Sequence, residues 1–177
     1  MEKKINNKST GNSYHLSQII IHWVIAFLVI YQFTSGEGIE FLVLESCIKS
    51  ETNDLKSCQY LNNHYVVGVL IFLLMIIRLF LRFLLGSPQL SKSVPLIIKI
   101  LAKLSHGIIY FTLLLMPISG LYMYYFNSGV SQFLHIVFSK ILLFLILLHI
   151  CAVAFHEGIL GSKLFYRMST IIKNKDK

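Results

Sequence analysis

The stretch from residue 131 to residue 158, SQFLHIVFSKILLFLILLHICAVAFHEG, decides the fold class, because its only charged residues are Lys140 and Glu157. A helix needs roughly 20 apolar residues to cross the ~30 Å hydrocarbon core of a membrane. Three further apolar runs lie near residues 18–35, 64–85 and 104–126. The sequence therefore predicts an all-α integral membrane protein, with four transmembrane helices forming a four-helix bundle as a single domain over residues 1–177.

The composition supports a membrane protein. Apolar residues of the set AVILMFWYC make up 55% of the chain and charged residues only 14%, a balance that excludes an ordinary soluble domain. The connections between the runs leave no room for a separate soluble catalytic domain, so any chemistry must lie inside the bundle or at its two ends. The apolar run that follows the polar N-terminal tail lacks a signal-type cleavage site, and we expect it to remain as the first helix.

The basic residues predict the orientation, because cytoplasmic loops carry an excess of Lys and Arg. Basic residues gather in the N-terminal tail, around the connection between the second and third helices, and in the C-terminal tail, whereas the opposite side has only Lys49 and Lys56. Both termini are therefore expected to be cytoplasmic. The formal charge of +8 follows from this asymmetry and from attraction to anionic membrane lipid, so no nucleic acid partner is expected.

The loop between the first two helices, residues 36–62, is predicted to face outward and is acidic. It contains Cys47 and Cys58. If that side is an oxidising periplasm, a disulfide between them would close the loop, and otherwise both remain thiols. Cys151 falls within the fourth helix, where packing is the simpler interpretation.

Six histidines lie within the apolar segments or at their ends. They are His22, His64, His106, His135, His149 and His156. An ionisable side chain at such depth is costly and usually faces the bundle interior for a functional reason. A single histidine would more often be a structural, hydrogen-bonded residue, but six together indicate a common function.

The spacing of two of them predicts a cofactor arrangement. His135 and His149 are fourteen residues apart, so they point within about 40° of each other and lie roughly 21 Å apart along the helix. A haem between helices needs a second axial imidazole at matching depth. The first helix enters from the cytoplasmic side, so His22 lies at the depth of His149. The second helix enters from outside, so His64 lies at the depth of His135. We therefore predict two b-type haems held by these two pairs.

Small residues follow three of these ligands by one helical turn, namely Ala26, Gly68 and Ser139. They would leave room for a flat porphyrin beside the helix, although small residues also serve ordinary helix packing in membranes. Val153, at the corresponding place after His149, fits this pattern less well.

Arg78 lies fourteen residues after His64, on the same face and about 21 Å further along, level with the predicted inner haem. A buried guanidinium needs an anionic partner, and haem propionates would supply one. The alternative is that Arg78 extends to the cytoplasmic interface, an interpretation that suits Arg82 better.

His156 lies seven residues beyond His149, on the same face and about 10 Å nearer the cytoplasm. It could hydrogen-bond a quinone carbonyl or accept a quinol proton. His106 could line the same pocket, or it could be a structural residue.

These residues together carry a resemblance to a known family. The segments are Ile21-His22-Trp23, Asn63-His64-Tyr65 with Gly68, Arg78 with Arg82, Leu104-Ser105-His106 with Tyr110, Met116-Pro117-Ile118-Ser119-Gly120, and the series His135, His149 and His156. In this order they resemble the bacterial cytochrome b561 family over about residues 17–167.

The resemblance implies a multi-pass protein of the bacterial inner membrane that binds two haem b groups. Its ligands would be His22 with His149 and His64 with His135, and ubiquinone or menaquinone would react near the cytoplasmic haem beside His156. The family also resembles the cytochrome b subunits of formate dehydrogenases and nickel hydrogenases. Some stand-alone members oxidise superoxide at the periplasmic face and pass the electron to ubiquinone.

Two features depart from the stand-alone members. The connection at residues 127–130 is short, and the loop between the first two helices is long. The outer loop is also acidic, which disfavours superoxide as a substrate unless Lys49, Lys56 and Lys140 line the entrance, because steering an anion needs positive potential.

Three interpretations remain open on the sequence. The first is a stand-alone, quinone-linked oxidoreductase that exchanges electrons with an outer donor or acceptor. The second is a membrane-anchor cytochrome b subunit whose acidic outer loop docks a periplasmic redox protein. The third is a small transporter in which the histidines form a metal or proton pathway, and the two depth-matched pairs argue against it.

Overall fold

The computed structural model describes residues 14–36, 47, 55–88, 95–126, 128–158, 165 and 168. Four long helices contain nearly all of them: α1 (Leu16–Gly36), α3 (Leu55–Leu85), α4 (Leu96–Phe126) and α5 (Gly129–Gly158). No strand occurs within the described ranges. Each helix is long and apolar enough to cross a membrane. The predicted all-α bundle of four membrane helices is thus confirmed.

The helix ends follow local chemistry, and α3 and α4 begin two turns or more before the predicted apolar spans. Pro95 precedes α4, and its carbonyl accepts from the N–H groups of Ile98 and Lys99 at 3.1 and 3.2 Å. Gly86 ends α3 with a φ of 71°, and its N–H donates to the carbonyl of Arg82. Glycine suits this left-handed position because it has no Cβ.

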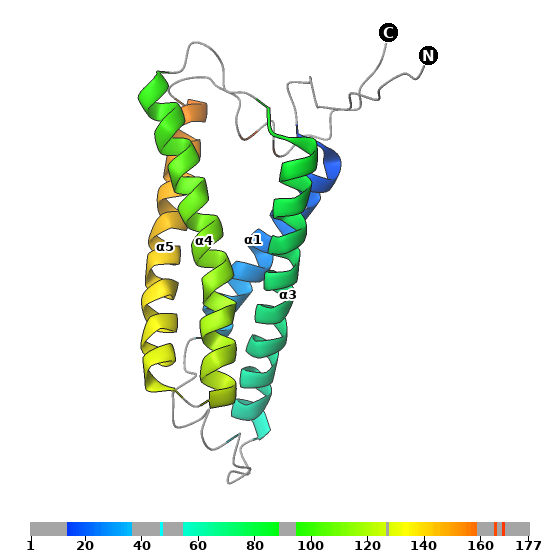
Figure 1. Cartoon of the computed structure of the whole chain (residues 1–177), viewed down its shortest axis with the longest axis vertical. Helices are drawn as coiled ribbons and strands as arrows, with labels where there is room; N and C mark the ends of the chain where they lie inside the picture. The colour runs from blue at the N-terminus through cyan, green and yellow to red at the C-terminus, as the bar shows by residue number, and fades with distance from the viewer. Residues whose placement is uncertain are drawn as a thin grey trace, which may run out of the picture.

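Successive helices run in opposite directions along the long axis of the molecule (Figure 1). Helix α1 packs on α3, α3 on α4, and α4 on α5. The end of α3, the start of α4 and the end of α5 therefore lie at one end of the bundle, which we call the inner end. The end of α1, the start of α3 and the start of α5 lie at the opposite, outer end.

The buried core lies where the helices meet. It contains Ile25, Val29, Ile71, Met75, Leu113 and Leu142. The outward faces are also apolar, and Phe83 for example is 88% exposed. Such surfaces are typical of helices whose neighbours are lipid chains.

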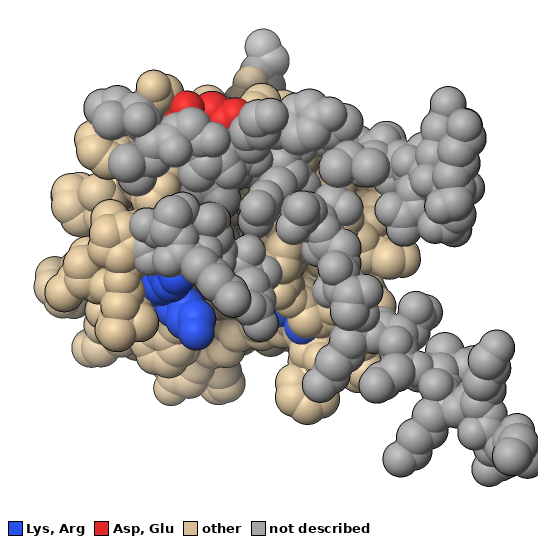
Figure 2. Space-filling view, turned by 90° about the horizontal axis from the view of Figure 1, so that it is seen from above, with Lys and Arg blue, Asp and Glu red and all other residues tan. Residues whose placement is uncertain are grey.

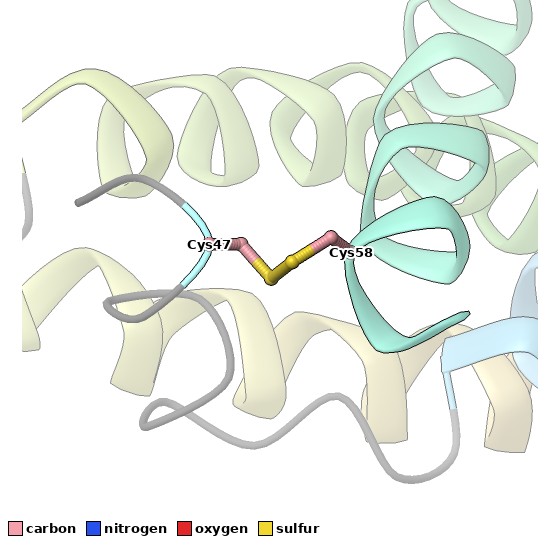
Figure 3. Close-up of a disulfide and its surroundings, with 2 residues drawn as sticks. All are labelled: Cys47 and Cys58. Carbon is pink, nitrogen blue, oxygen red and sulfur yellow. A yellow bond between two sulfur atoms is a disulfide. The ribbon is translucent and has the colours of Figure 1, made fainter. Parts of the chain in front are cut away.

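The two ends of the bundle differ in chemistry. Figure 2 looks onto the inner end and shows Lys and Arg side chains at its surface, with an acidic group near its edge. At the outer end, a disulfide joins Cys47 to Cys58 in the first turns of α3 (Figure 3). The pairing that the sequence left open is therefore present, whereas the acidic residues of the same loop lie outside the described residues. Cys151 is a free thiol exposed on α5, so it is not part of the buried core.

Candidate functional site

A cavity of about 320 Å³ lies between all four helices in the outer half of the bundle. Its walls are mostly apolar, and the imidazoles of His64 on α3 and His135 on α5 both line it. Their ring centres are 6.2 Å apart and their planes are inclined by 69°. The structure therefore brings together the two outer histidines that the sequence paired by depth.

This separation suits one metal ion held between the two rings. Imidazole nitrogens bind metals at about 2.0–2.1 Å, and the ring centre lies about 1 Å behind the nitrogen, so two opposed ligands place their ring centres about 6 Å apart. No group of three or more His, Cys, Asp or Glu suited to a metal occurs in the part of the chain that the structure describes. A pair of imidazoles fits a metal whose other ligands come from a macrocycle.

The hydrogen bonds of the His135 ring favour Nε2 as a metal ligand. Its Nδ1 lies 3.0 Å from the carbonyl oxygen of Met116 and 3.1 Å from Oγ of Ser119. A carbonyl oxygen only accepts hydrogen bonds, so Nδ1 must carry the proton and donate. This leaves the lone pair of Nε2 available for a metal and fixes the orientation of the ring.

Two glycines make room for the two imidazoles. A Cβ at Gly36 would come within 3.1 Å of Cε1 of His64, and a Cβ at Gly120 would come within 3.1 Å of Cε1 of His135. These distances are shorter than ordinary carbon contacts of about 3.5–4.0 Å. The lack of a side chain at Gly36 and Gly120 therefore leaves the space that the two imidazole rings occupy.

Aromatic side chains also line the cavity. The rings of Tyr65 and Tyr124, which both line the cavity, have centres 4.8 Å apart. The hydroxyl oxygens of Tyr65 and Tyr125 lie 3.0 Å apart, within hydrogen-bond distance. This hydrogen bond joins α3 to α4 beside His64.

A second cluster of histidines occupies the inner half. The ring centres of His106 on α4 and His149 on α5 are 5.0 Å apart, with the planes nearly perpendicular at 87°. Nδ1 of His106 lies 2.6 Å from the carbonyl oxygen of Ala102, so it donates to that oxygen. His22 on α1 lies close enough to His106, His149 and Arg78 for their charges to interact. The four predicted inner residues are thus gathered in one region.

Arg78 is buried in this inner region with 8% of its surface exposed. Its Nη1 donates to the backbone carbonyl of Gln18 at 3.1 Å. The guanidinium groups of Arg78 and Arg82 each lie 5.9 Å from the centre of the Tyr110 ring. Arg82, which the sequence assigned to the cytoplasmic interface, therefore also lies against α4.

The inner arginines have no carboxylate partner among the described residues. Glu157 is the only acidic residue there, and its Oε2 accepts from the backbone N–H of Phe165 at 3.1 Å. Two guanidinium groups gathered without a carboxylate from the described part of the chain are a suitable place for an external anion. The propionate pairing predicted for Arg78 remains a prediction that this arrangement supports.

Comparison with known proteins agrees with these features. The family model described as prokaryotic cytochrome b561 matches residues 13–170. The chain belongs to this family. It is also 29% identical over 155 residues to cytochrome b562 of Cereibacter sphaeroides, an alignment that covers 88% of this chain and 94% of that protein.

Family membership places this b561-type cytochrome in the bacterial inner membrane as a multi-pass protein that binds haem b and transports electrons. His156, predicted to serve the quinone, is buried near the inner end of α5 with 9% exposure. His15 is exposed, and its Nδ1 lies 2.9 Å from Oγ of Ser17.

Sequence reasoning missed several residues of the cytochrome's outer site. Gly36 was considered only as the start of the outer loop, and Gln32 had no assigned role. Ser119 and Gly120 appeared only within a motif and had no assigned role. Their contacts with His64 and His135 join different helices, so no spacing within one helix could have revealed them.

Proposed function

We propose that the cytochrome holds two b haems, one between His64 and His135 and one between His22 and His149. In this proposal, electrons pass across the membrane between a quinone at the inner end and a donor or acceptor at the outer end. The observation that carries it is the outer pair of imidazoles, 6.2 Å apart across a cavity. Bound haem supplies one-electron chemistry at iron.

The chain's own residues have separate tasks. His64 and His135 would hold the outer haem, and the hydrogen bond from Nδ1 of His135 to the carbonyl of Met116 keeps that ring in place. Arg78 balances the negative charge of propionates at the inner haem. His156, with His106 as the second candidate, donates to or accepts from a ubiquinone or menaquinone near the inner haem.

We place the inner end of the bundle in the cytoplasm. The Lys and Arg residues around the α3–α4 connection support this orientation. The disulfide between Cys47 and Cys58 supports it too, because such bonds persist in the oxidising periplasm and not in the cytoplasm. A quinol proton would then be released near the cytoplasmic surface.

The outer electron partner has two candidates. As a stand-alone quinone-linked oxidoreductase, the protein would react with a small molecule such as superoxide beside the outer cavity, which Tyr65 and Tyr124 line. As a membrane-anchor subunit, it would dock a periplasmic redox protein on the acidic outer loop. Co-purification of a soluble subunit from the native membrane would favour the second candidate.

Haem stoichiometry tests the proposal. The purified protein should contain two b haems per chain by pyridine haemochrome assay, and its dithionite-reduced-minus-oxidised spectrum should show low-spin b-type bands. One haem per chain would contradict the two-pair assignment. No haem at all would favour the metal or proton pathway.

A further inference from the structure

Gln32 of α1 contacts the helix turn that carries His64. Its Nε2 donates to the backbone carbonyl oxygen of His64 at 2.9 Å. Since a carbonyl oxygen only accepts, the amide orientation is fixed, and Oε1 is the atom left over. A Cβ at Gly68 would lie 3.3 Å from Nε2 of Gln32. The lack of a side chain at Gly68 therefore leaves room for the Gln32 amide.

Two polar atoms beside the outer cavity are buried without a hydrogen-bond partner among the described residues. They are Oε1 of Gln32 and Nδ1 of His64, and both residues line the cavity. Native proteins rarely leave such atoms unsatisfied. One atom is an acceptor. The other becomes a donor once Nε2 of His64 binds a metal, because the remaining nitrogen then carries the proton.

The partner histidine shows what is missing at His64. Nδ1 of His135 already donates to the carbonyl of Met116, whereas Nδ1 of His64 has no such acceptor. Metal-bound imidazoles almost always donate their second N–H to a carbonyl, a carboxylate or a water. A water molecule both accepts and donates, so it can satisfy Nδ1 of His64 and Oε1 of Gln32 together.

We infer that Gln32 is a positioning residue for the outer haem ligand, holding a water between its Oε1 and the Nδ1–H of His64. The inference rests on the proposed ligation by His64. An accepted hydrogen bond at Nδ1–H makes the imidazole a stronger electron donor to iron. Stronger donation favours the oxidised iron, so Gln32 lowers the reduction potential of the outer haem.

Two substitutions with opposite expected effects test this role. Gln32→Met has similar length but no acceptor, and the midpoint potential of the outer haem should shift to more positive values. Gln32→Glu keeps an acceptor and adds charge, and the potential should shift to more negative values. Spectroelectrochemical titration of the purified holoprotein measures both, with the outer haem identified as the one lost in His135→Ala.

Both variants lose the hydrogen bond from Nε2 of Gln32 to the carbonyl of His64. If Gln32 only joined α1 to α3, Gln32→Met would leave the midpoint potential of the outer haem unchanged, and that result would overturn the inference. The added charge in Gln32→Glu lowers the potential in either case, so the uncharged variant decides. If Gln32→Met fails to retain the outer haem, Gln32→Leu, which also lacks an acceptor, replaces it in the same titration.

Matched controls separate this role from the ligation itself. Gln132→Met changes a glutamine on α5 that does not line the cavity, and it should leave both potentials unchanged. The haem content of His64→Ala tests the proposed ligation separately. If His64→Ala retained both haems, the proposed function would fail, regardless of the potentials measured in the Gln32 variants.

Discussion

At the scale of single residues, the two outer histidines differ in what surrounds them. Backbone and hydroxyl oxygens of α4 hold His135 from behind, and Gly36 of α1 limits the position of His64 from the side. A ligand ring held in one tautomer and one orientation loses less freedom when it binds a metal. In the proposed outer site, the residues around the two histidines would therefore contribute to haem affinity without touching the iron.

Replacing either histidine of a proposed pair should remove the same haem. We expect His64→Ala and His135→Ala each to lower the haem content from two to about one per chain with the same spectral loss, because either change leaves one haem with a single axial imidazole. His22→Ala and His149→Ala should remove the other haem. Haemochrome assays and difference spectra of the four variants check this. The assignment fails if His106→Ala removes a haem while one of these four does not.

Adding one methyl group at Gly120 should weaken binding of the outer haem. Gly120→Ala places a carbon 3.1 Å from Cε1 of His135, and overpacking of this kind costs about 1–3 kcal/mol. We expect about 10-fold or more weaker retention of the outer haem during purification or dilution. Gly107→Ala on the same helix is the control, because nothing lies within 4 Å of its Cβ position. Equal haem retention in the two variants would rule out a steric role for Gly120.

His156 should affect quinone reactions without affecting haem binding. In His156→Ala, quinol-driven haem reduction should slow by roughly 10²-fold or more, because the variant lacks a hydrogen bond and a proton acceptor. Reduction by dithionite should keep its rate, since it does not need the quinone pocket. Stopped-flow absorbance measures both rates. An unchanged quinol rate, or loss of haem, would move the quinone site elsewhere, and His106 would be tested next.

At the scale of elements, α5 carries both proposed haem ligands of the C-terminal half and spans the whole membrane. Its N-terminus is capped by Ser128, whose carbonyl accepts from Gln132 at 3.1 Å and whose Oγ accepts from Ser131 at 3.4 Å. Helix α3 carries His64 near its outer end and Arg78 near its inner end. Two straight helices thus set the depth of the two proposed sites, and α1 and α4 complete them.

The disulfide should stabilise the outer end of α3. Cys47 and Cys58 are 11 residues apart in sequence, and closing a loop of this length stabilises the folded state by about 2–3 kcal/mol. Cys47→Ser should lower the thermal midpoint by several degrees, measured by circular dichroism in detergent. Cys151→Ser is the matched control and should not change it, because this thiol is free and exposed. A midpoint equal to that of the parent would show that the bond does not stabilise the native bundle.

At the scale of the whole molecule, the bundle has a basic inner end and an outer end closed by a disulfide. The proposed haem sites lie one in each half, between helices whose outward faces are apolar. An electron carrier of this shape connects two aqueous sides without an aqueous channel. Its orientation therefore decides which side exchanges protons with quinone.

Cysteine labelling should show this orientation directly. In a Cys151→Ser background, Gly129→Cys at the start of α5 should react with a membrane-impermeant maleimide in intact spheroplasts. Ser87→Cys, just beyond α3, should react only after lysis. Both positions are exposed in the structure. Reaction of Ser87→Cys in intact spheroplasts would reverse the proposed orientation.

The class of the protein could be predicted from local composition alone. Apolar runs of this length cannot remain in water, and a lone helix in lipid satisfies its own backbone, so four membrane helices followed from local composition. The fourteen-residue spacing of His135 and His149 fixed their common face and depth, because helix geometry is regular. The resemblance then predicted the family, which the match over residues 13–170 shows.

Only the tertiary structure decided which groups surround the ligands. The carbonyl of Met116 lies behind His135, Gly36 lies beside His64, and the amide of Gln32 lies over the His64 turn. Each contact joins two helices, and its geometry depends on the rotation and tilt of both. Those angles arise from side-chain packing along the whole interface, so the periodicity of any single helix does not contain them.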